Sequence, residues 1–413
     1  MKPTPVFHLK VPTPDFLDLP WDRSITEWEG ICIRLAQVAT GLSRHPVVFV
    51  NYGGELYAIK ELPIGKASQE FQALLKMEEL RLPSVEPIGH VNFLEPEYRA
   101  SVLITRYLEG SLPYRTIFMS TSLNRYRQHL LDAMAWLLVQ LHLSGIFWGD
   151  CSLSNTLFRR DAGMLQAYLV DAETAEITKP RLAPTLRYQD LEIMEVNVTG
   201  DIGDLIAAGW INPDLHMADT GLYLRQRYRA LWDEVTREET ILPGESFRIQ
   251  ERIRALNALG FAVEEIETPL TPQGETVRLR ISVTDRNFHR DLLMELTGLE
   301  IEEMQARTMI NEIRELKSNL SHQRNQSLPL SAAAYYWYEN IYKPVTERLV
   351  PLIADRLKKQ PVNECLETVD PAELYCEILE HKWYLSERAQ KDVGHLTAVG
   401  DYLNTISSSL ANP

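Results

Sequence analysis

Residues 147–155 read Phe-Trp-Gly-Asp-Cys-Ser-Leu-Ser-Asn, and an apolar run at residues 168–171 ends in Asp171. The first stretch places Asp150 five positions before Asn155. Phosphoryl transfer uses such a set, because one carboxylate orients the attacking hydroxyl while an amide oxygen and a second carboxylate hold Mg²⁺ against the nucleotide phosphates. An Asp and an Asn at this spacing arise often by chance, so the interpretation depends on features elsewhere in the chain.

A β-hairpin that ends in a lysine is predicted upstream. Two apolar runs, Val-Val-Phe-Val at 47–50 and Leu-Tyr-Ala-Ile-Lys at 56–60, flank Gly53 and Gly54. The two glycines therefore form the turn and are not a phosphate-binding loop. Lys60 has the position of a nucleotide-binding lysine at the end of a strand, although a lysine on an edge strand is usually a surface residue.

A short polar segment before this hairpin is a candidate nucleotide-covering loop. It contains Gly41, Ser43, Arg44 and His45, and Gly41 precedes Lys60 by nineteen residues. Its backbone N–H groups, together with one of the three polar side chains, are predicted to face the phosphates. The segment lacks the further glycines of a complete phosphate loop, so an ordinary turn explains Gly41 equally well.

A helix beginning near residue 67 is predicted to bury a carboxylate. Glu70 shares one helical face with the apolar side chains of Ala67, Leu74 and Met77. A buried carboxylate needs a partner because burial without one is unfavourable, and Lys60 is the predicted partner. Glu78 is the second candidate, and a solvated surface glutamate is the ordinary alternative.

A thick apolar stripe over residues 130–141 predicts a core helix that stops at Gly145 and leads into the 147–155 stretch. A second hairpin, turning at residues 159–163, then separates Asn155 from Asp171. Because the strands of a hairpin run side by side, this arrangement is expected to deliver Asp171 next to Asn155.

The order of these residues along the chain resembles that of the protein-kinase-like superfamily. The resemblance implies an α+β fold with a β-rich N-lobe and a helical C-lobe, and it implies ATP and Mg²⁺ as cofactors. Asp150 becomes the catalytic base, Lys60 pairs with the α- and β-phosphates, and Glu70 positions Lys60. Asn155 and Asp171 become the Mg²⁺ ligands.

The closest branch is similar to the bacterial lipopolysaccharide core heptose and Kdo kinases, and more distantly to the aminoglycoside phosphotransferases. Gly149 stands before the catalytic Asp, where protein kinases have Arg. Segments 187–205, 337–345 and 381–383 also resemble an uncharacterised bacterial family that attaches a domain of unknown function to such a core. The kinase resemblance covers about residues 25–240.

The resemblance also implies a hinge and shows departures from the kinase pattern. The strand at 103–108 resembles the segment that meets adenine through backbone groups, which makes Arg106 and Leu108 candidate nucleotide contacts. Trp148 replaces the usual His, residues 171–173 read Asp-Ala-Glu, and no Ala-Pro-Glu segment follows. We therefore expect a constitutively formed site without a phosphorylated activation loop.

Four side chains near the site have competing interpretations. Glu173 is an extra carboxylate near the metal or a surface acid, and the surface acid is favoured. Asp201 and Asp204 are helix caps or braces of the catalytic loop, and capping is favoured. Cys151 next to the catalytic Asp is interpreted as a small buried filler.

The pattern of apolar runs, polar stretches and prolines predicts five segments. An extended N-terminal arm is followed by the two lobes, a small α/β module and a helical C-terminal domain, with a polar linker at residues 318–331 where the last two meet. Their predicted bounds are 1–24, 25–108, 109–240, 245–325 and 332–410.

Composition excludes several classes of protein. The formal charge of −15 disfavours nucleic acid, whose phosphates require clustered Lys and Arg, and it disfavours anionic membrane surfaces. The 4 cysteines show no zinc spacing. Neither a signal sequence nor an apolar run long enough to span a membrane is found, so the predicted location is the cytoplasm.

The sequence thus predicts an ATP- and Mg²⁺-dependent phosphotransferase that acts on a hydroxyl of a small molecule, a sugar-containing compound or a protein. Two alternatives stay open. One is a non-catalytic nucleotide-binding scaffold of the pseudokinase type, and the other is transfer of AMP by the same metal ligands. The acceptor itself is not identified by the sequence, because fold does not specify it.

Overall fold

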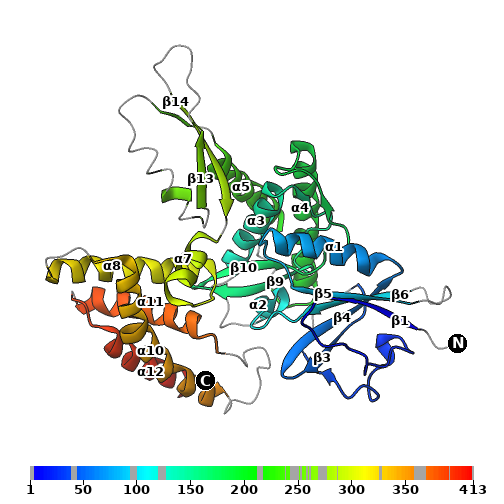
Figure 1. Ribbon diagram of the computed structural model, residues 1–413, viewed down its shortest axis with the longest axis horizontal. Coiled ribbons are helices and arrows are strands. Elements are labelled where there is room, and N and C mark those ends of the chain that lie inside the picture. The colour runs from blue at the N-terminus through cyan, green and yellow to red at the C-terminus, as the bar shows by residue number, and fades with distance from the viewer. Residues whose placement is uncertain are drawn as a thin grey trace. The chain divides into compact units, whose positions relative to one another are not determined.

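The computed structural model describes the greater part of the chain, and Figure 1 shows its ribbon. It divides into two compact units, Met1–Arg159 with Leu165–Leu231 and Arg160–Met164 with Trp232–Pro413. The described residues are 4–38, 44–93, 100–119, 127–211, 217–237, 239–241, 251, 254–256, 259, 262–267, 277–285, 287–324, 328–357, 369–389 and 391–411.

The first unit begins with a six-stranded sheet of order β1-β5-β6-β4-β3-β2 in which every neighbouring pair is antiparallel. The predicted hairpin is confirmed as β3 and β4, which pair from Val47 opposite Lys60 to Tyr52 opposite Glu55. Gly53 makes the tight turn at φ 64°. The strands are β1 (Pro5–Leu9), β2 (Leu35–Ala36), β3 (Val47–Tyr52), β4 (Glu55–Pro63), β5 (Pro87–Phe93) and β6 (Ala100–Arg106).

Both faces of this sheet are covered. Helix α1 (Lys66–Glu79) packs on one face, and successive side chains of a strand alternate between faces, so Lys60 points towards α1 while Ile59 points away. The opposite face packs against Phe16, Leu19, Trp21, Ile25 and Trp28, which include residues of the short helix η1 (Ile25–Glu27). The predicted N-terminal arm thus adds β1 to the sheet and supplies Phe16, Leu19 and Trp21 to this core.

The rest of the first unit is mainly helical. Helix α3 (Arg127–Leu143) is the predicted core helix, and it stops at Gly145 with φ 79°. A Cβ on Gly145 would lie 2.1 Å from the Lys179 carbonyl oxygen, so only glycine fits there. The other elements are β7 (Leu112–Pro113), α2 (Tyr114–Met119), β8 (Ile146–Phe147), β9 (Thr156–Asp161), β10 (Met164–Leu169), β11 (Glu176–Ile177), α4 (Pro184–Ala207) and α5 (Met217–Thr236).

The second unit has a small sheet of order β12-β14-β13 and a group of helices. The alternating strand predicted near residues 277–283 is β14, and it pairs with β13 through Val263 and Ile266. The elements are β12 (Glu239–Ile241), β13 (Ala262–Glu267), β14 (Val277–Asp285), α7 (Phe288–Thr297), α8 (Glu303–Arg324), α9 (Leu330–Trp337), the π-helical turn η3 (Tyr338–Tyr342), α10 (Lys343–Leu357), α11 (Pro371–Ala389) and α12 (His395–Ala411).

One hydrophobic core joins these helices. It includes Leu293 of α7, Ile310 of α8, Trp337 of α9 and Tyr375 of α11, all without exposed surface. Helix α8 extends to Arg324, well into the stretch predicted as a polar linker. The helices on both sides of that stretch therefore share a single interior.

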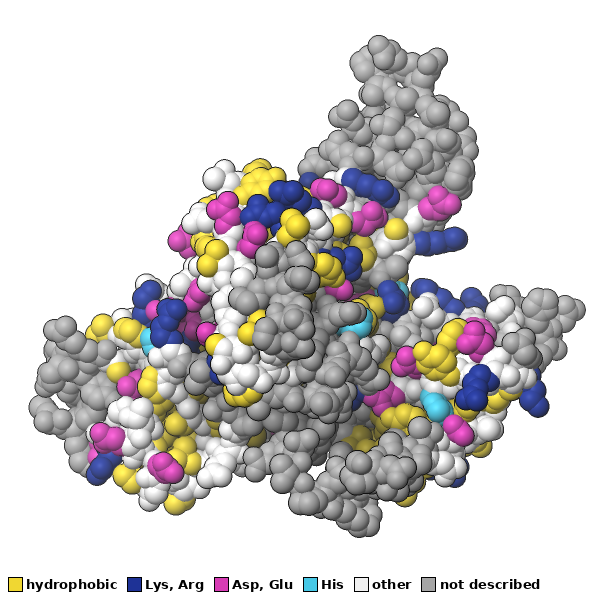
Figure 2. Space-filling view, turned by 180° about the vertical axis from the view of Figure 1, so that it is seen from behind, with side chains coloured by type: hydrophobic (Ala, Val, Ile, Leu, Met, Phe, Trp, Pro, Cys, Tyr) yellow, Lys and Arg dark blue, Asp and Glu magenta, His cyan; other side chains and the backbone are white. Residues whose placement is uncertain are grey.

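On the face seen in Figure 2, basic and acidic side chains are interspersed and do not form a continuous basic area. Among the helices within the described ranges, none is long and apolar enough to cross a membrane.

Candidate active site

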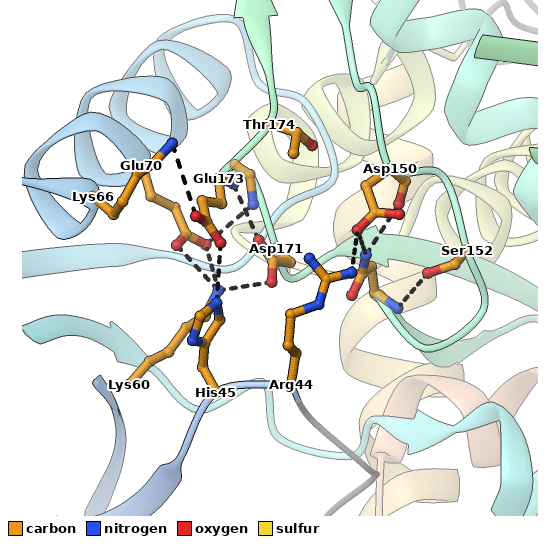
Figure 3. Close-up of polar contacts among 12 residues, drawn as sticks. Arg44, His45, Lys60, Lys66, Glu70, Asp150, Ser152, Asp171, Glu173 and Thr174 are labelled. Carbon is orange, nitrogen blue, oxygen red and sulfur yellow. Dashed lines mark hydrogen bonds and ion pairs between the residues drawn. The ribbon is translucent and has the colours of Figure 1, made fainter. Parts of the chain in front are cut away.

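The predicted lysine–glutamate pair lies at the centre of the site (Figure 3). The Nζ atom of Lys60, on β4, is 3.1 Å from Oε2 of Glu70, on α1. The same Nζ is 2.8 Å from Oδ2 of Asp171, which follows β10. Glu70 has no exposed surface and Lys60 is 9 % exposed. The pairing predicted for Glu70 is confirmed, whereas Glu78 pairs with Lys10 at 2.7 Å near the surface.

One positive charge is thus shared by two carboxylates. Burial raises the pKa of Glu70 to about 7, although Lys60 acts in the opposite direction. Burial alone would lower the pKa of Lys60, but the charges of Glu70 and Asp171 outweigh it and raise this pKa. Glu70 also accepts a hydrogen bond from the Ala172 N–H at 3.1 Å, which ties α1 to the segment after β10. A cation that bound Asp171 would release Lys60 from part of this charge.

The loop at residues 147–155, here called the catalytic loop after the kinase resemblance, brings Asp150 and Asn155 together. The Asn155 Nδ2 donates to the backbone oxygen of Asp150 at 3.0 Å and to its Oδ2 at 3.1 Å. Both N–H donors of the Asn155 amide are directed at Asp150, so Oδ1 of Asn155 is the atom left for a cation. The Val170 N–H donates to the Asn155 carbonyl oxygen at 3.1 Å, which places β10 and Asp171 beside the loop as predicted.

Helix α4 holds the backbone of this loop from one face. Asp190 accepts hydrogen bonds from the N–H groups of Trp148 at 2.7 Å and Gly149 at 2.8 Å. Three turns later, Asp201 accepts from the Leu153 N–H and from the Ser154 hydroxyl, both at 2.8 Å. The favoured interpretation of Asp201 as a helix cap is wrong, because it lies inside α4 and braces the catalytic loop.

The sequence interpretation missed Asn197. It lies on the same face of α4, between Asp190 and Asp201, and its Nδ2 donates to Oδ1 of Asp150 at 3.1 Å. The spacing of the three polar residues, seven and then four positions apart, matches one helical face. That spacing is the signal that identifies them, once α4 is known to run beside the loop.

Buried groups in turn fix Asp190 and Asp171. The Nε2 of His142 is 3.1 Å from Oδ2 of Asp190, and its Nδ1 is 2.7 Å from the Tyr228 hydroxyl. Burial lowers the pKa of His142, so the neutral ring donates to Asp190 and accepts from Tyr228. The fully buried Trp148, which replaces the kinase His, donates from Nε1 to the Asp171 carbonyl oxygen at 3.1 Å.

Glu173 is not the surface acid that the sequence favoured. Its side chain is 17 % exposed, its Oε2 is 3.1 Å from His45 Nε2, and its Oε1 is 3.8 Å from Lys66 Nζ. It therefore connects the segment before β3 and the first turn of α1 with the segment after Asp171.

The predicted nucleotide contacts are only partly brought together. The Arg44 guanidinium reaches to 3.6 Å from Oδ2 of Asp150. Gly41 and Ser43 lie outside the described residues. The Arg106 guanidinium is directed elsewhere and pairs with Glu55 at 2.6 Å and Glu86 at 2.7 Å.

Backbone groups of residues 106 and 108 also have partners within the protein. The Arg106 N–H already donates to the Glu86 carbonyl oxygen at 2.9 Å, and the Leu108 carbonyl oxygen accepts from the Ser111 N–H at 3.3 Å. The nucleotide-binding roles of Arg106 and Leu108 stay predictions.

The donor set suits Mg²⁺ and not a structural metal. Over the described residues, no group of three or more His, Cys, Asp or Glu side chains can hold an ion. Asn155 and Asp171 offer one amide oxygen and one carboxylate, and Mg²⁺ is commonly held by one or two carboxylates together with nucleotide phosphates. Cys151 is buried and free, and burial raises the pKa of its thiol, as fits a filler.

Comparisons with known proteins agree with this architecture. Residues 54–220 match the model of the lipopolysaccharide kinase (Kdo/WaaP) family, and residues 230–407 match a domain of unknown function, DUF4032. The resemblance inferred from the sequence is confirmed by the family models for both parts of the chain, and the structure has the predicted β-rich N-terminal sheet followed by a mainly helical part. The match supports a kinase-like phosphotransferase.

Two solved structures are also similar. WaaP in complex with acyl carrier protein has 15 % identity and a TM-score of 0.34, with 55 % of this chain and 88 % of that chain covered. An aminoglycoside-3'-phosphotransferase of type VIII has 14 % identity and a TM-score of 0.33, with 48 % and 86 % covered. A search of the curated proteins found no match.

Proposed function

We propose that this protein is an ATP- and Mg²⁺-dependent phosphotransferase that transfers the γ-phosphoryl group to a hydroxyl. The observation that carries the proposal is the position of Lys60, held between Glu70 and Asp171 in the site that contains Asp150 and Asn155. A protein that bound nucleotide only as a scaffold would not need a catalytic carboxylate oriented on both of its oxygens.

Asp150 is the proposed base. Asn197 holds its Oδ1 and Asn155 holds its Oδ2, so the plane of the carboxylate is fixed. Each carboxylate oxygen still has a second lone pair that can accept the proton of the acceptor hydroxyl. Fixing the base in this way removes the need to reorient it during the reaction.

Two cations are placed to neutralise the phosphates. Lys60 lies on the Asp171 side of the site and would pair with the α- and β-phosphates. Arg44 reaches Asp150 from the segment before β3, where the transferred group would pass, and would stabilise its developing charge. Asn155 and Asp171 would hold Mg²⁺, which would supply further charge neutralisation.

The acceptor class follows only from the family match. Because residues 54–220 match a lipopolysaccharide kinase family, a sugar hydroxyl is the favoured acceptor, ahead of another small molecule or a protein serine. The net charge of −15 argues against a nucleic-acid acceptor.

The test uses ATP labelled at the γ- or the α-phosphate, with Mg²⁺ and either sugar-containing glycolipid or the protein alone. Transfer of γ-label, reduced about 10²- to 10⁴-fold in Asp150→Asn, supports the proposal. Glu79→Gln, on the exposed side of α1, is the matched control and should leave transfer unchanged. Transfer of α-label would instead identify AMP transfer, and nucleotide binding without any transfer would identify a scaffold.

A further inference from the structure

The turn between β9 and β10 belongs to the second unit. The strands β9 and β10 extend from the catalytic loop, but residues Arg160–Met164 group with Trp232–Pro413. The turn therefore makes its contacts with the C-terminal helices, within one compact unit. Its Ala162 also packs against the hydrophobic core of those helices.

Asp161 is the first anchor of this turn. Its side chain is almost fully buried at 3 % exposure. Its Oδ1 accepts from the Gln305 N–H at 2.8 Å and its Oδ2 from the Met304 N–H at 3.1 Å, both in the first turn of α8. A carboxylate at this position satisfies helix N–H groups that have no partner inside the helix, and the helix dipole favours it.

Glu373 is the second anchor. Here the carboxylate belongs to a helix and accepts hydrogen bonds from the turn, the reverse of the arrangement at Asp161. It lies in the first turn of α11, is 2 % exposed, and accepts from the N–H groups of Ala162 at 2.6 Å and Gly163 at 2.9 Å. Gln305 joins the two anchors, because its Nε2 donates to Glu373 Oε2 at 3.0 Å.

Arg160 is the third member and supplies a positive charge to the network. Its guanidinium contacts Glu377 and lies 3.4 Å from Oε1 of Glu373. The turn thus offers its own carboxylate to α8, its backbone to α11 and its guanidinium to two acids of α11. Such a buried polar network is rigid when every member is satisfied and is strongly destabilised when one is removed.

The position of the turn in the chain gives these contacts a functional meaning. Strand β9 starts at Thr156, directly after Asn155, and β10 ends at Leu169, two residues before Asp171. The anchored turn therefore lies midway along the segment that connects the two proposed metal ligands. The register of the two strands sets where those ligands stand relative to each other.

We infer that the C-terminal unit is the anchor of the metal-binding hairpin, and that Asp161, Glu373 and Arg160 are positioning residues for Asn155 and Asp171. The inference rests on the proposed function for the role of the two ligands, but not for the anchoring itself. Energetic coupling between two sites is reciprocal, so a nucleotide–Mg²⁺ complex bound at the hairpin must also stabilise the first turns of α8 and α11.

Hydrogen exchange of the full-length protein tests the anchoring without any assay of activity. Glu373→Gln keeps the shape of the side chain but leaves an N–H of the turn facing an amide N–H. We expect exchange over residues 156–170 to rise by about 10-fold or more, as for the loss of a buried hydrogen bond to a charged group. Glu380→Gln, exposed and later in the same helix, should change nothing. Faster exchange confined to residues 303–312 and 371–380, with 156–170 unchanged, would overturn the inference.

Nucleotide binding tests the link to the site. In Glu373→Gln, the affinity for ATP with Mg²⁺ should fall by about 10-fold, while the affinity for ATP with EDTA should change less. In the unmodified protein, ATP with Mg²⁺ should slow exchange at residues 162–163 and 304–305. Equal losses with and without Mg²⁺, or no slowing at those amides, would contradict a role of the anchor in placing the metal ligands.

The two proposals fail in different ways. If the unmodified protein binds no ATP with Mg²⁺, the phosphotransferase proposal fails, and exchange over 156–170 in Glu373→Gln still decides whether the turn is anchored. If circular dichroism shows that Glu373→Gln does not fold, Arg160→Gln replaces it, since Arg160 is 26 % exposed and its loss leaves both carboxylate anchors in place. Arg160→Gln should then raise exchange over 156–170 by a smaller factor, and an unchanged rate would overturn the inference.

Discussion

The two units bury carboxylates in opposite ways. In the first, Glu70 and Asp171 share the single positive charge of Lys60. In the second, Glu312 accepts from the indole of Trp337 and the hydroxyl of Tyr375, both at 2.7 Å, and lies 2.6 Å from Nε2 of His395. The first arrangement has fewer positive than negative charges and can respond to an added cation. In the second, both carboxylate oxygens of Glu312 have partners, so no added cation is needed.

The pKa directions express the same difference. Burial raises the pKa of Glu70 to about 7, because the lowering effect of Lys60 is smaller than that of burial and the nearby charge of Asp171 adds to the increase. Burial would also raise the pKa of Glu312, but His395, with help from Tyr375 and Trp337, outweighs burial and holds this pKa below its ordinary value. The pKa values of the two carboxylates thus shift in opposite directions because different donors face them.

The largest effect is expected from Lys60→Met. It leaves Glu70 buried without its cation and should lower the free energy of unfolding by about 3 kcal/mol while abolishing binding of ATP with Mg²⁺. Urea denaturation and calorimetric titration measure the two effects. The double variant Lys60→Met with Glu70→Leu should recover stability without recovering binding, and Lys76→Met on the exposed side of α1 should change neither. Recovery of binding in the double variant would show that the pair is structural only.

The second unit should behave differently when its carboxylate is removed. Glu312→Ala strands the polar groups of Trp337, Tyr375 and His395, and should lower the free energy of unfolding by about 2 kcal/mol. The three partners of Glu312 do not belong to the anchored turn. The affinity for ATP with Mg²⁺ should therefore stay within about 2-fold. Glu315→Ala, exposed on the same helix, is the control. A large loss of affinity in a folded Glu312→Ala protein would remove the contrast between the two regions.

A smaller effect is expected from the brace on the catalytic base. Asn197→Ala frees Oδ1 of Asp150, and we expect turnover to fall by about 10-fold with unchanged ATP affinity, because the carboxylate is no longer held in one plane. Gln189→Ala, exposed on α4, serves as control. A change in ATP affinity with turnover intact would mean that Asn197 contacts nucleotide.

The smallest effect concerns acid stability of the first unit. Burial lowers the pKa of His90, with a further contribution from His8, which stacks on it at 4.6 Å. The folded state then binds this proton less readily than the unfolded state, so stability is fully present above the ordinary pKa of about 6.5 and is lost as pH falls below it. Between pH 7.5 and 5.5, thermal unfolding of His90→Phe should change less than that of the unmodified protein. The expected difference is below about 1 kcal/mol, and parallel curves would show that His90 does not titrate in this range.

Local patterns predicted the parts of the site that are close in sequence or share a regular element. The apolar face of the helix at 67–77 predicted the burial of Glu70 and, through the unfavourable burial of a lone charge, its pairing with Lys60. The alternation of strands and turns predicted the hairpins that carry Lys60 and lead to Asp171. Each of these inferences needed only periodicity over a few residues.

The supporting residues could not be found in this way. Asp190 and Asp201 are more than forty residues from the loop backbone that they hold, and Glu373 is 211 residues from Ala162. In isolation each is an acid on a helix, for which capping or solvation is the ordinary outcome. Only the packing of α4 beside the loop, and of α11 beside the turn, turns them into acceptors of buried N–H groups.

The sequence by itself therefore determined which chemical groups the candidate site contains and their order along the chain, because those groups lie on elements whose periodicity is local. Tertiary structure alone decided how these groups are held: which acids brace the catalytic loop, which amide orients Asp150, and which helices receive the hairpin turn. The physical reason is that a backbone N–H carries no side-chain signature. Its partner is known only when distant segments have packed against each other.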